Sequence, residues 1–287
     1  MGRAIPSQKN WVVHVIDFTD ISVAIIRRTF RSRFKLASLT ERSVIFRNLV
    51  RRLFFEGDDI QVIPRNSSIE INHRIQVPEN VALPSEVLRR MILRSRYIFR
   101  MDFCICRVSS GCSSYPHDLG CLFLGPGAMR ISEKVGRLIS AEEALEHIER
   151  CQEAGLVHII GRNRIDSVWL NSGPHDELLS VCSCCECCCL WKMTPLLSED
   201  IASSITPMEG VELKREESSC VLCGRCEEAC FTGAIALGKE LEHDAKKCLI
   251  CGRCAERCPE GAIKIIMDPE AVDEAIKRVE VLVDVES

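Results

Sequence analysis

Apolar residues in the first third of the chain mostly recur with helical spacing, and arginines stand between them. Residues 11–18 (WVVHVIDF) are the exception, because their continuous apolar run is typical of a buried strand. Ser38 and Glu41 have the spacing of a capping box, which predicts a helix through ERSVIFRNLVRRLFF that ends near Gly57. The same spacing predicts a second helix over residues 85–99.

The middle of the chain contains a well-marked helix and strand unit, ISAEEALEHIERCQEAGLVHII. Ser140 and Glu143 form a second capping box, and Gly155 is placed to end the helix in a left-handed turn. LVHII then predicts a strand, and residues 167–170 (SVWL) predict another. Cys151 falls among the core-facing positions of the helix, so we interpret it as a small buried apolar side chain.

Cysteine is the residue type that most changes this picture. There are 19 cysteines in 287 residues, and the N-terminus MGRAIPSQKNW shows no apolar signal-peptide segment. We therefore expect a reducing, cytoplasmic compartment, where thiols persist or bind metal. Every long apolar run is interrupted by charged residues, so no transmembrane segment is expected.

Charge is divided unevenly along the chain. Residues 1–107 hold 19 Lys and Arg against 10 Asp and Glu, whereas residues 208–287 hold 11 against 18. The basic front fits a solvated helical face, a docking surface for an acidic redox partner or for the chain's own acidic end, or nucleic-acid binding. Nucleic acid is disfavoured, because stacking aromatics and a recognition-helix motif are both absent from the sequence.

The most specific signal is a duplicated cysteine run near the C-terminus. Residues 220–230 read CVLCGRCEEAC and residues 248–258 read CLICGRCAERC, each a C-x2-C-x2-C-x3-C pattern, and Gly-Ala-Ile follows both. This duplication resembles the bacterial-type ferredoxins that bind two [4Fe-4S] clusters, over residues of about 215–267. Zinc is the alternative, although zinc ribbons use paired C-x2-C knuckles instead of four-cysteine runs.

The resemblance implies the ligands of both clusters, because the fourth cysteine of each run serves the other cluster. It assigns one cluster to Cys220, Cys223, Cys226 and Cys258. It assigns the other to Cys248, Cys251, Cys254 and Cys230. Gly224 and Gly252 suit loops whose backbone amides approach cluster sulfides. One departure is visible: Phe231 stands where the second run has Pro259.

Ten further cysteines lie in the middle of the chain, before the duplicated runs. They are Cys104, Cys106, Cys112, Cys121, Cys182, Cys184, Cys185, Cys187, Cys188 and Cys189. Their CICR and CSCCECCC segments resemble an uncharacterised family of multi-cysteine iron–sulfur proteins from anaerobic archaea and bacteria, over about residues 97–265, with Ser183 where relatives commonly have Asn. No settled function comes with this family.

The ten thiols suit one or two further iron–sulfur clusters. They suffice for two [4Fe-4S] clusters with two thiols left over, or for one cubane and one larger or site-differentiated cluster; zinc and free redox thiols are the alternatives. Adjacent cysteines are expected to serve different centres. Arg107 could donate to cluster sulfur or be an ordinary surface arginine. His117 and His175 are left out of the expected ligand set.

These patterns predict an α+β fold in three domains. Residues 1–100 are expected to form a small basic helical or mixed domain, residues 101–207 a cysteine-rich α+β domain with an additional iron–sulfur site, and residues 208–287 a dicluster ferredoxin-like domain. Asp268 and Pro269 are placed to start a C-terminal helix through AVDEAIKRVEVLV.

The function that follows is transfer of single low-potential electrons between redox partner proteins. Nucleotide-binding motifs and an evident general acid or nucleophile are absent from the sequence, so no catalytic residue is assigned and no stand-alone enzyme activity is required. Two alternatives remain: a reductase with its own site-differentiated iron–sulfur centre in the middle domain, and a redox-sensing DNA-binding regulator. Partners, potentials and oligomeric state are not encoded in these patterns.

Overall fold

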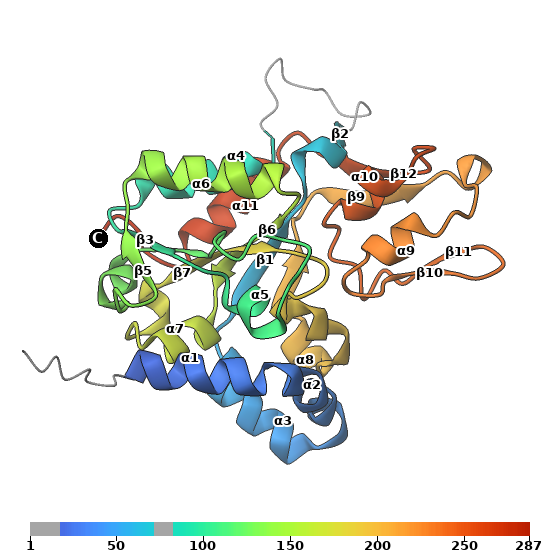
Figure 1. Ribbon diagram of the computed structural model, residues 1–287. Coiled ribbons are helices and arrows are strands. Elements are labelled where there is room, and N and C mark those ends of the chain that lie inside the picture. The colour runs from blue at the N-terminus through green and yellow to red at the C-terminus, as the bar shows by residue number, and fades with distance from the viewer. Residues whose placement is uncertain (1–17, 72–82) are drawn as a thin grey trace, which may run out of the picture.

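The computed structural model describes residues 18–71 and 83–287. Its fold is α+β, as the sequence predicts. The strand predicted for residues 11–18 falls outside the described residues except for Phe18, which begins helix α1 (Phe18–Thr29). Figure 1 shows one large sheet with helices on both faces and a smaller cysteine-rich unit at one side.

The basic front folds into short consecutive helices. After α1 come a 3-10 turn (Phe30–Ser32), α2 (Arg33–Arg42), α3 (Val44–Val50) and a π-helical turn (Arg51–Phe55). The predicted capping box at Ser38 is wrong, because Ser38 lies inside α2. The break falls at Ser43, whose extended backbone ends α2 and whose Oγ accepts a hydrogen bond from the Phe46 amide at 3.3 Å. Gly57 follows with φ +79°, at the predicted end.

The large sheet has seven strands in the order β5-β3-β4-β7-β6-β1-β8. The bounds are β1 Asp59–Ile63, β3 Ile98–Met101, β4 Leu122–Leu124, β5 Gly136–Leu138, β6 Val157–Arg162, β7 Leu179–Cys184 and β8 Ile205–Pro207. All neighbours are antiparallel except β1 and β8. The sheet combines residues from both sides of position 100, so the predicted division into N-terminal and middle domains stays a prediction about folding units.

The helix predicted over residues 85–99 is too long. Helix α4 covers Ser85–Arg94, and Ser95 then takes an extended conformation. The next residues form β3, which lies between β4 and β5. Position within the sheet makes this segment a strand, because it lies between two partner strands and gains backbone hydrogen bonds on both sides.

One face of the sheet is covered by α4, α6 (Ala141–Glu153) and α11 (Ala271–Glu280), which share a single buried core with it (Figure 1). The capping box of Ser140 and Glu143 that starts α6 is confirmed, as are Gly155 and the following strand. Helix α11 is also confirmed, but it begins at Ala271 with Glu270 as its N-cap, later than Asp268 predicted.

The other face is covered by α1, α5 (Ile105–Ser110) and α7 (Arg164–Leu170). The strand predicted at residues 167–170 is wrong, because these residues lie in α7. Asn163 caps this helix by accepting a hydrogen bond from the Ile165 amide at 3.2 Å. The buried Asp166 accepts hydrogen bonds from Trp169 Nε1 of the same helix at 3.0 Å and from Ser180 Oγ at 2.8 Å, and the second of these attaches the helix to β7.

The cysteine-rich unit contains two short helices, two small sheets and a strand from the front of the chain. Its elements are β9 Val211–Arg215, α9 Arg225–Ala229, β10 Ile235–Leu237, β11 Leu241–His243, α10 Arg253–Arg257 and β12 Ile263–Met267. Helix α8 (Glu199–Ala202), outside this unit, precedes β8. Strand β2 (Ile69–Ile71) pairs in parallel with β12. The N-terminal segment is thus part of the sheet of this unit.

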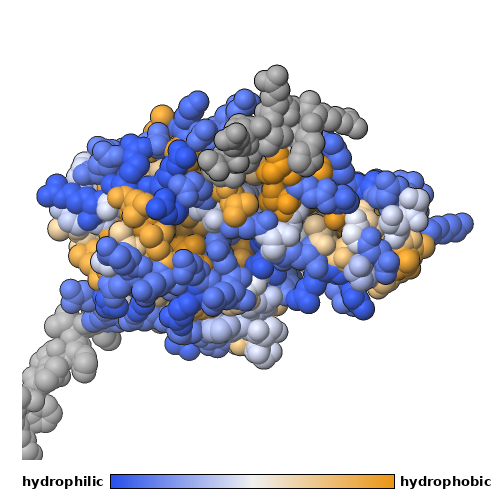
Figure 2. All heavy atoms as spheres, turned by 90° about the horizontal axis from the view of Figure 1, so that it is seen from above, coloured by the Kyte–Doolittle hydropathy of each residue, from blue (hydrophilic) through white to orange (hydrophobic). Residues whose placement is uncertain are grey.

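No helix within the described ranges is long and apolar enough to cross a membrane. In the view from above, hydrophilic residues cover most of the visible face and hydrophobic residues gather in patches between them (Figure 2).

Candidate metal centres

The two C-terminal cysteine runs fold into the same loop twice. Leu222 and Ile250 both have positive φ (53° and 45°), and Gly224 and Gly252 follow with φ of 77° and 85°. Each loop opens directly into a short helix, α9 or α10. Left-handed residues at equal positions aim backbone amides inward, which suits a loop that surrounds an anionic cluster.

Backbone amides donate to the fourth cysteine of each run at the same distance. The Ala234 amide lies 3.2 Å from Cys230 Sγ, and the Ala262 amide lies 3.2 Å from Cys258 Sγ. Charge-assisted hydrogen bonds of this kind stabilise a thiolate, which is the form that binds iron. The donor set and its amide support therefore fit a cluster held by thiolates.

In the structure, the fourth cysteine of each run lies near cysteines of the other run. One cavity is lined by Cys220, Cys223 and Cys226 together with Cys258. On the other side, burial raises the pKa of Cys248 to about 11, and the neighbouring thiolates of Cys251 and Cys230 add to that rise. Burial and the same neighbours, with Cys248, also raise the pKa of Cys254.

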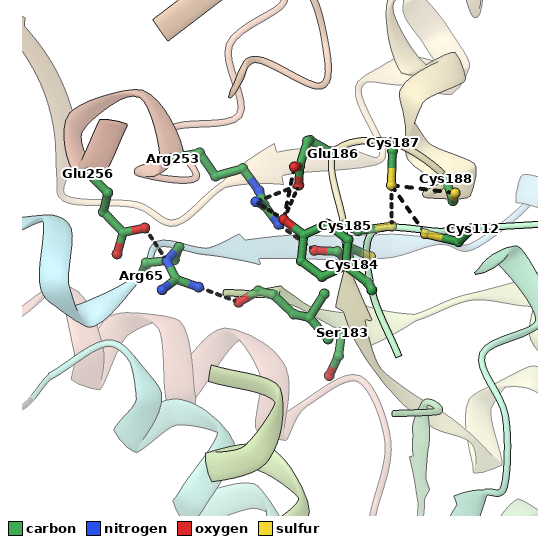
Figure 3. Close-up of polar contacts among 12 residues, drawn as sticks. Arg65, Cys112, Ser183, Cys184, Cys185, Glu186, Cys187, Cys188, Arg253 and Glu256 are labelled. Atoms are coloured by element: carbon green, nitrogen blue, oxygen red, sulfur yellow. Dashed lines mark hydrogen bonds and ion pairs between the residues drawn. The ribbon is translucent and has the colours of Figure 1, made fainter. Parts of the chain in front are cut away.

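A second set, here called the four-thiol group, lies beside the seven-stranded sheet. It consists of Cys112, Cys185, Cys187 and Cys188, whose sulfurs all lie within 4.8 Å of one another (Figure 3). Three separations, Cys112 to Cys187, Cys187 to Cys185 and Cys188 to Cys187, are 3.5 Å. Four thiols this close have the donor set for one tetrahedral ion or one cubane.

Backbone geometry assembles this group from two loops. Gly111, with φ 65°, ends α5 and directs Cys112 toward the loop that follows β7. His117 Nε2 donates to the Cys112 carbonyl at 2.7 Å, so this histidine holds the loop. Cys187 is exposed, whereas Cys185 and Cys188 are buried. The group therefore lies at the surface with one sulfur open to solvent.

The remaining six thiols, here called the six-thiol group, line one cavity on the opposite face of the sheet from α4, α6 and α11. They are Cys104, Cys106, Cys121, Cys182, Cys184 and Cys189. Strand alternation explains part of this arrangement, because Cys182 and Cys184 lie on the opposite face of β7 from the core residues Leu179 and Val181. The register places Cys121 across from Cys182, and their sulfurs are 3.6 Å apart.

Helix α5 provides the opposite wall of the cavity. Cys104 is its N-cap and Cys106 its second residue. A side-chain hydrogen bond from Cys106 lowers the pKa of Cys104 to about 6, with help from Arg107 and the first helical amides, and the same bond raises the pKa of Cys106. One thiolate is thus favoured even without metal.

Adjacent cysteines divide between the two groups in two of three cases. Cys184 and Cys185 separate, as do Cys188 and Cys189, because neighbouring residues point apart. Cys187 and Cys188 both belong to the four-thiol group, so the expectation that adjacent cysteines serve different centres is wrong for this pair. Spacing alone does not reveal the division, since it depends on where β7 ends.

Arg107 is completely buried, so its interpretation as a surface arginine is wrong. Its guanidinium donates to the Ser183 carbonyl at 3.0 Å and to the Leu119 carbonyl, and no hydrogen bond to sulfur is formed. Burial lowers its pKa, but the surrounding thiolates, Cys104 first, raise that pKa by more. Arg107 is therefore a fixed cation between the two middle groups.

An ion pair that sequence reasoning missed joins the middle cysteines to the C-terminal unit. Arg253 stands between Cys251 and Cys254, and its Nη1 lies 2.7 Å from the Glu186 carboxylate, between Cys185 and Cys187 (Figure 3). Only 7% of the Arg253 side chain is exposed. Its Nη2 donates to the Cys184 carbonyl at 2.8 Å.

Tyr115 completes this connection. Its hydroxyl lies 2.8 Å from a Glu186 carboxylate oxygen, to which it donates, and burial together with this bond raises the pKa of Tyr115. The sequence shows a charged residue inside each of two cysteine-rich segments, Arg253 in one and Glu186 in the other. It does not reveal that the two side chains meet.

Apolar contacts reinforce the connection. Phe231 and Leu249 of the C-terminal unit are buried in one core with Trp191 and Cys189 of the middle segment. Phe231, which stands where the second run has a proline, thus packs against the segment around Trp191. Cys151 is fully buried in a cluster with Leu119, Leu156 and two members of the four-thiol group, Cys185 and Cys188. His175 lies beside Gly57.

Comparison with known proteins supports the C-terminal site. Residues 219–262 match a family model described as 4Fe-4S dicluster domain. These residues include all eight cysteines of the duplicated runs. Neither the curated proteins nor the solved structures contain a match to this chain.

Proposed function

We propose that this protein is a multi-cluster electron carrier of the cytoplasm of an anaerobe, passing single low-potential electrons between redox partner proteins. The ferredoxin-like unit supplies two [4Fe-4S] clusters, each of which takes up and releases one electron. The four-thiol group holds a further centre at the surface. The resemblance of the CICR and CSCCECCC segments to an uncharacterised multi-cysteine family supports the proposal.

The observation that carries this proposal is the contact between Arg253 and Glu186. It fixes the loop of Cys251 and Cys254 against the loop of Cys185 and Cys187, with the arginine side chain almost fully buried. Electron transfer slows steeply as the distance between centres grows, so a rigid connection between two sets of cysteines is what a carrier requires. A positive charge between anionic clusters also favours an added electron.

Electron flow is balanced in one-electron steps. A low-potential donor protein loses one electron to the C-terminal unit, and that unit loses it again as the centre at the four-thiol group gains it. The exposed Cys187 makes that group a natural place for a second partner to dock. No group transfer or bond cleavage is needed.

The test is iron and sulfide analysis of anaerobically isolated protein, followed by EPR after reduction. We expect about twelve or more irons per chain, because the two C-terminal clusters account for only about eight. Cys187→Ala should remove about four irons and one EPR signal, whereas Cys151→Ala should remove none. Colourless protein that contains zinc at these positions would refute the proposal.

The transfer itself is tested by mixing the oxidised protein with a reduced viologen in a stopped-flow instrument. We expect two kinetic phases of absorbance change, an early one from the first centre reduced and a later one from redistribution. Cys187→Ala should abolish the later phase and leave the early one. A single phase in the unaltered protein would contradict transfer between the centres.

A second candidate, a reductase, is favoured by one observation. The six-thiol group surrounds a cavity of about 200 Å³, which a simple carrier does not need. An exchangeable, non-cysteine ligand on one iron would support this candidate. Cyanide that replaces such a ligand on the iron would be detected by infrared spectroscopy.

A further inference from the structure

The cavity of the six-thiol group is much larger than a four-cysteine site in the same protein. It measures about 200 Å³, whereas the cavity lined by Cys220, Cys223, Cys226 and Cys258 measures about 20 Å³. Cysteines line part of each cavity. The six-thiol group therefore borders much more space than the four-cysteine site does.

The six sulfurs form one continuous lining. Cys104 accepts a hydrogen bond from Cys106, and the sulfurs of Cys121 and Cys182 lie 3.6 Å apart. Cys184 in turn interacts with both Cys182 and Cys189. A cubane has four irons and accepts four protein thiolates, so a single cubane leaves two of these six without iron.

Two buried donors around the cavity have no partner among the described residues. Arg107 lines the cavity, is fully buried, and its Nε forms no hydrogen bond. Arg33 also lines it, and its buried Nε is likewise without a partner. An unsatisfied buried N–H is costly, and inorganic sulfide is an acceptor that these donors could reach.

The basic N-terminal helices close the cavity. Ile26 of α1, Phe30 of the 3-10 turn and Leu36 of α2 line it opposite the sheet. Phe30 is only 6% exposed, and the Arg33 guanidinium lies 4.0 Å from the centre of its ring. The result is a mainly apolar chamber that the six thiols and two guanidinium groups help to line.

We propose that the six-thiol group binds one iron–sulfur centre with more than four irons, held by all six thiolates. Two cubes that share a bridging sulfide meet this requirement, because each cube then leaves three irons for thiolates. This proposal rests on the proposed function in one respect: both assume that the protein binds iron–sulfur clusters. Cys185 lines the same cavity while belonging to the four-thiol group, so the two centres are neighbours.

The experiment is native mass spectrometry of the full chain, isolated anaerobically after co-expression with an iron–sulfur assembly system. Iron and sulfide are counted for the unaltered protein and for six single Cys→Ala variants of the six-thiol group. Cys151→Ala is the control, because Cys151 is a buried cysteine in neither group. Mössbauer spectra of ⁵⁷Fe-labelled protein report the same centre independently of its mass.

We expect more than about sixteen irons per chain, since four cubanes would account for about sixteen. Each of the six variants should lose or alter the same iron population, and Cys151→Ala should lose nothing. Two or more silent variants, a loss of only four irons, or zinc in the cavity would overturn the proposal. The irons of the C-terminal unit and the four-thiol group are counted separately, so their absence would instead refute the proposed function.

Discussion

Ser68 lies directly against Gly252, on the outside of the second cysteine loop. A β-carbon at Gly252 would collide with the Ser68 hydroxyl, whereas one at Gly224, the equivalent residue of the first loop, would meet only Leu237 at 3.7 Å. Both glycines have positive φ. The two cysteine loops therefore differ in what packs against them: the segment that contains Ser68 packs against the second loop and not against the first.

This asymmetry predicts unequal effects of the same substitution. Gly224→Ala should lower the free energy of unfolding by about 1 kcal/mol, because alanine is strained at positive φ. Gly252→Ala adds the clash and should cost about 1–3 kcal/mol more. Thermal unfolding of the anaerobically isolated proteins measures both. Equal midpoints would show that the segment is not held against the loop.

The ion pair of Arg253 and Glu186 predicts a second contrast between repeats. Arg253→Gln removes the cationic partner of Glu186 and keeps its hydrogen bond from Tyr115; because 24% of the Glu186 side chain is exposed to water, the variant should cost about 1–3 kcal/mol. Arg225 occupies the same position in the first run but is exposed, so Arg225→Gln should change stability by less than about 0.5 kcal/mol. Denaturant titration followed by far-UV circular dichroism compares them.

The same pair of variants separates stability from electron transfer. If Arg253 positions the two loops, Arg253→Gln should slow the later phase of viologen reduction while its iron content stays unchanged. Arg225→Gln should leave both phases as they are. Slowing of both variants alike would contradict a specific role for the connection.

Local sequence signals predicted much of the fold where they were self-sufficient. The capping box of Ser140 and Glu143 specified α6, because a cap is decided by residues three apart. The same signal failed at Ser38, since the chain there continues its helix to the next serine, Ser43. The strand at Ile98–Met101 was missed because partner strands far along the chain decide it.

The candidate sites show the same division. The duplicated runs carry their ligand pattern in their own spacing, and residues 219–262 match a known domain. The separation of the middle thiols depends instead on strand alternation in β7 and on where that strand ends at Cys184. The contact of Arg253 with Glu186 needed the assembled fold, because 66 residues separate them.

Phe231 predicts how strongly the C-terminal unit is attached. Its ring is 7% exposed and packs in the core that includes Trp191 and Leu249. Phe231→Ala should destabilise the protein by about 3–5 kcal/mol, because it removes a buried aromatic ring. Val221→Ala, at an apolar residue of the same unit that is 61% exposed, should have little effect.

Hydrogen exchange localises this effect. Faster exchange at the buried face of both the C-terminal unit and the segment around Trp191 is expected for Phe231→Ala. Loss of protection confined to the C-terminal unit would show that the ring serves only its own domain.

Asp58 predicts a pH dependence of stability. Burial raises the pKa of this carboxyl group to about 7, although the Arg164 amide donates to its Oδ1 at 2.8 Å. Its Oδ2 is buried without a hydrogen-bond partner among the described residues. Because the pKa is higher in the folded than in the unfolded protein, the folded state holds the proton more tightly, and stability is lost as the pH rises from about 4 to 7.

Replacing Asp58 with asparagine removes this loss and keeps the oxygen that accepts from Arg164. Asp58→Asn should therefore be more stable than the unaltered protein at pH 8, with a difference that shrinks toward pH 5. Denaturant midpoints at several pH values under anaerobic conditions measure the difference. Asp59→Asn is the contrasting variant, because it breaks an ion pair with Arg278 at 2.6 Å and should stabilise at no pH. A pH-independent difference for Asp58→Asn would mean that this carboxyl group is already ionised across the range.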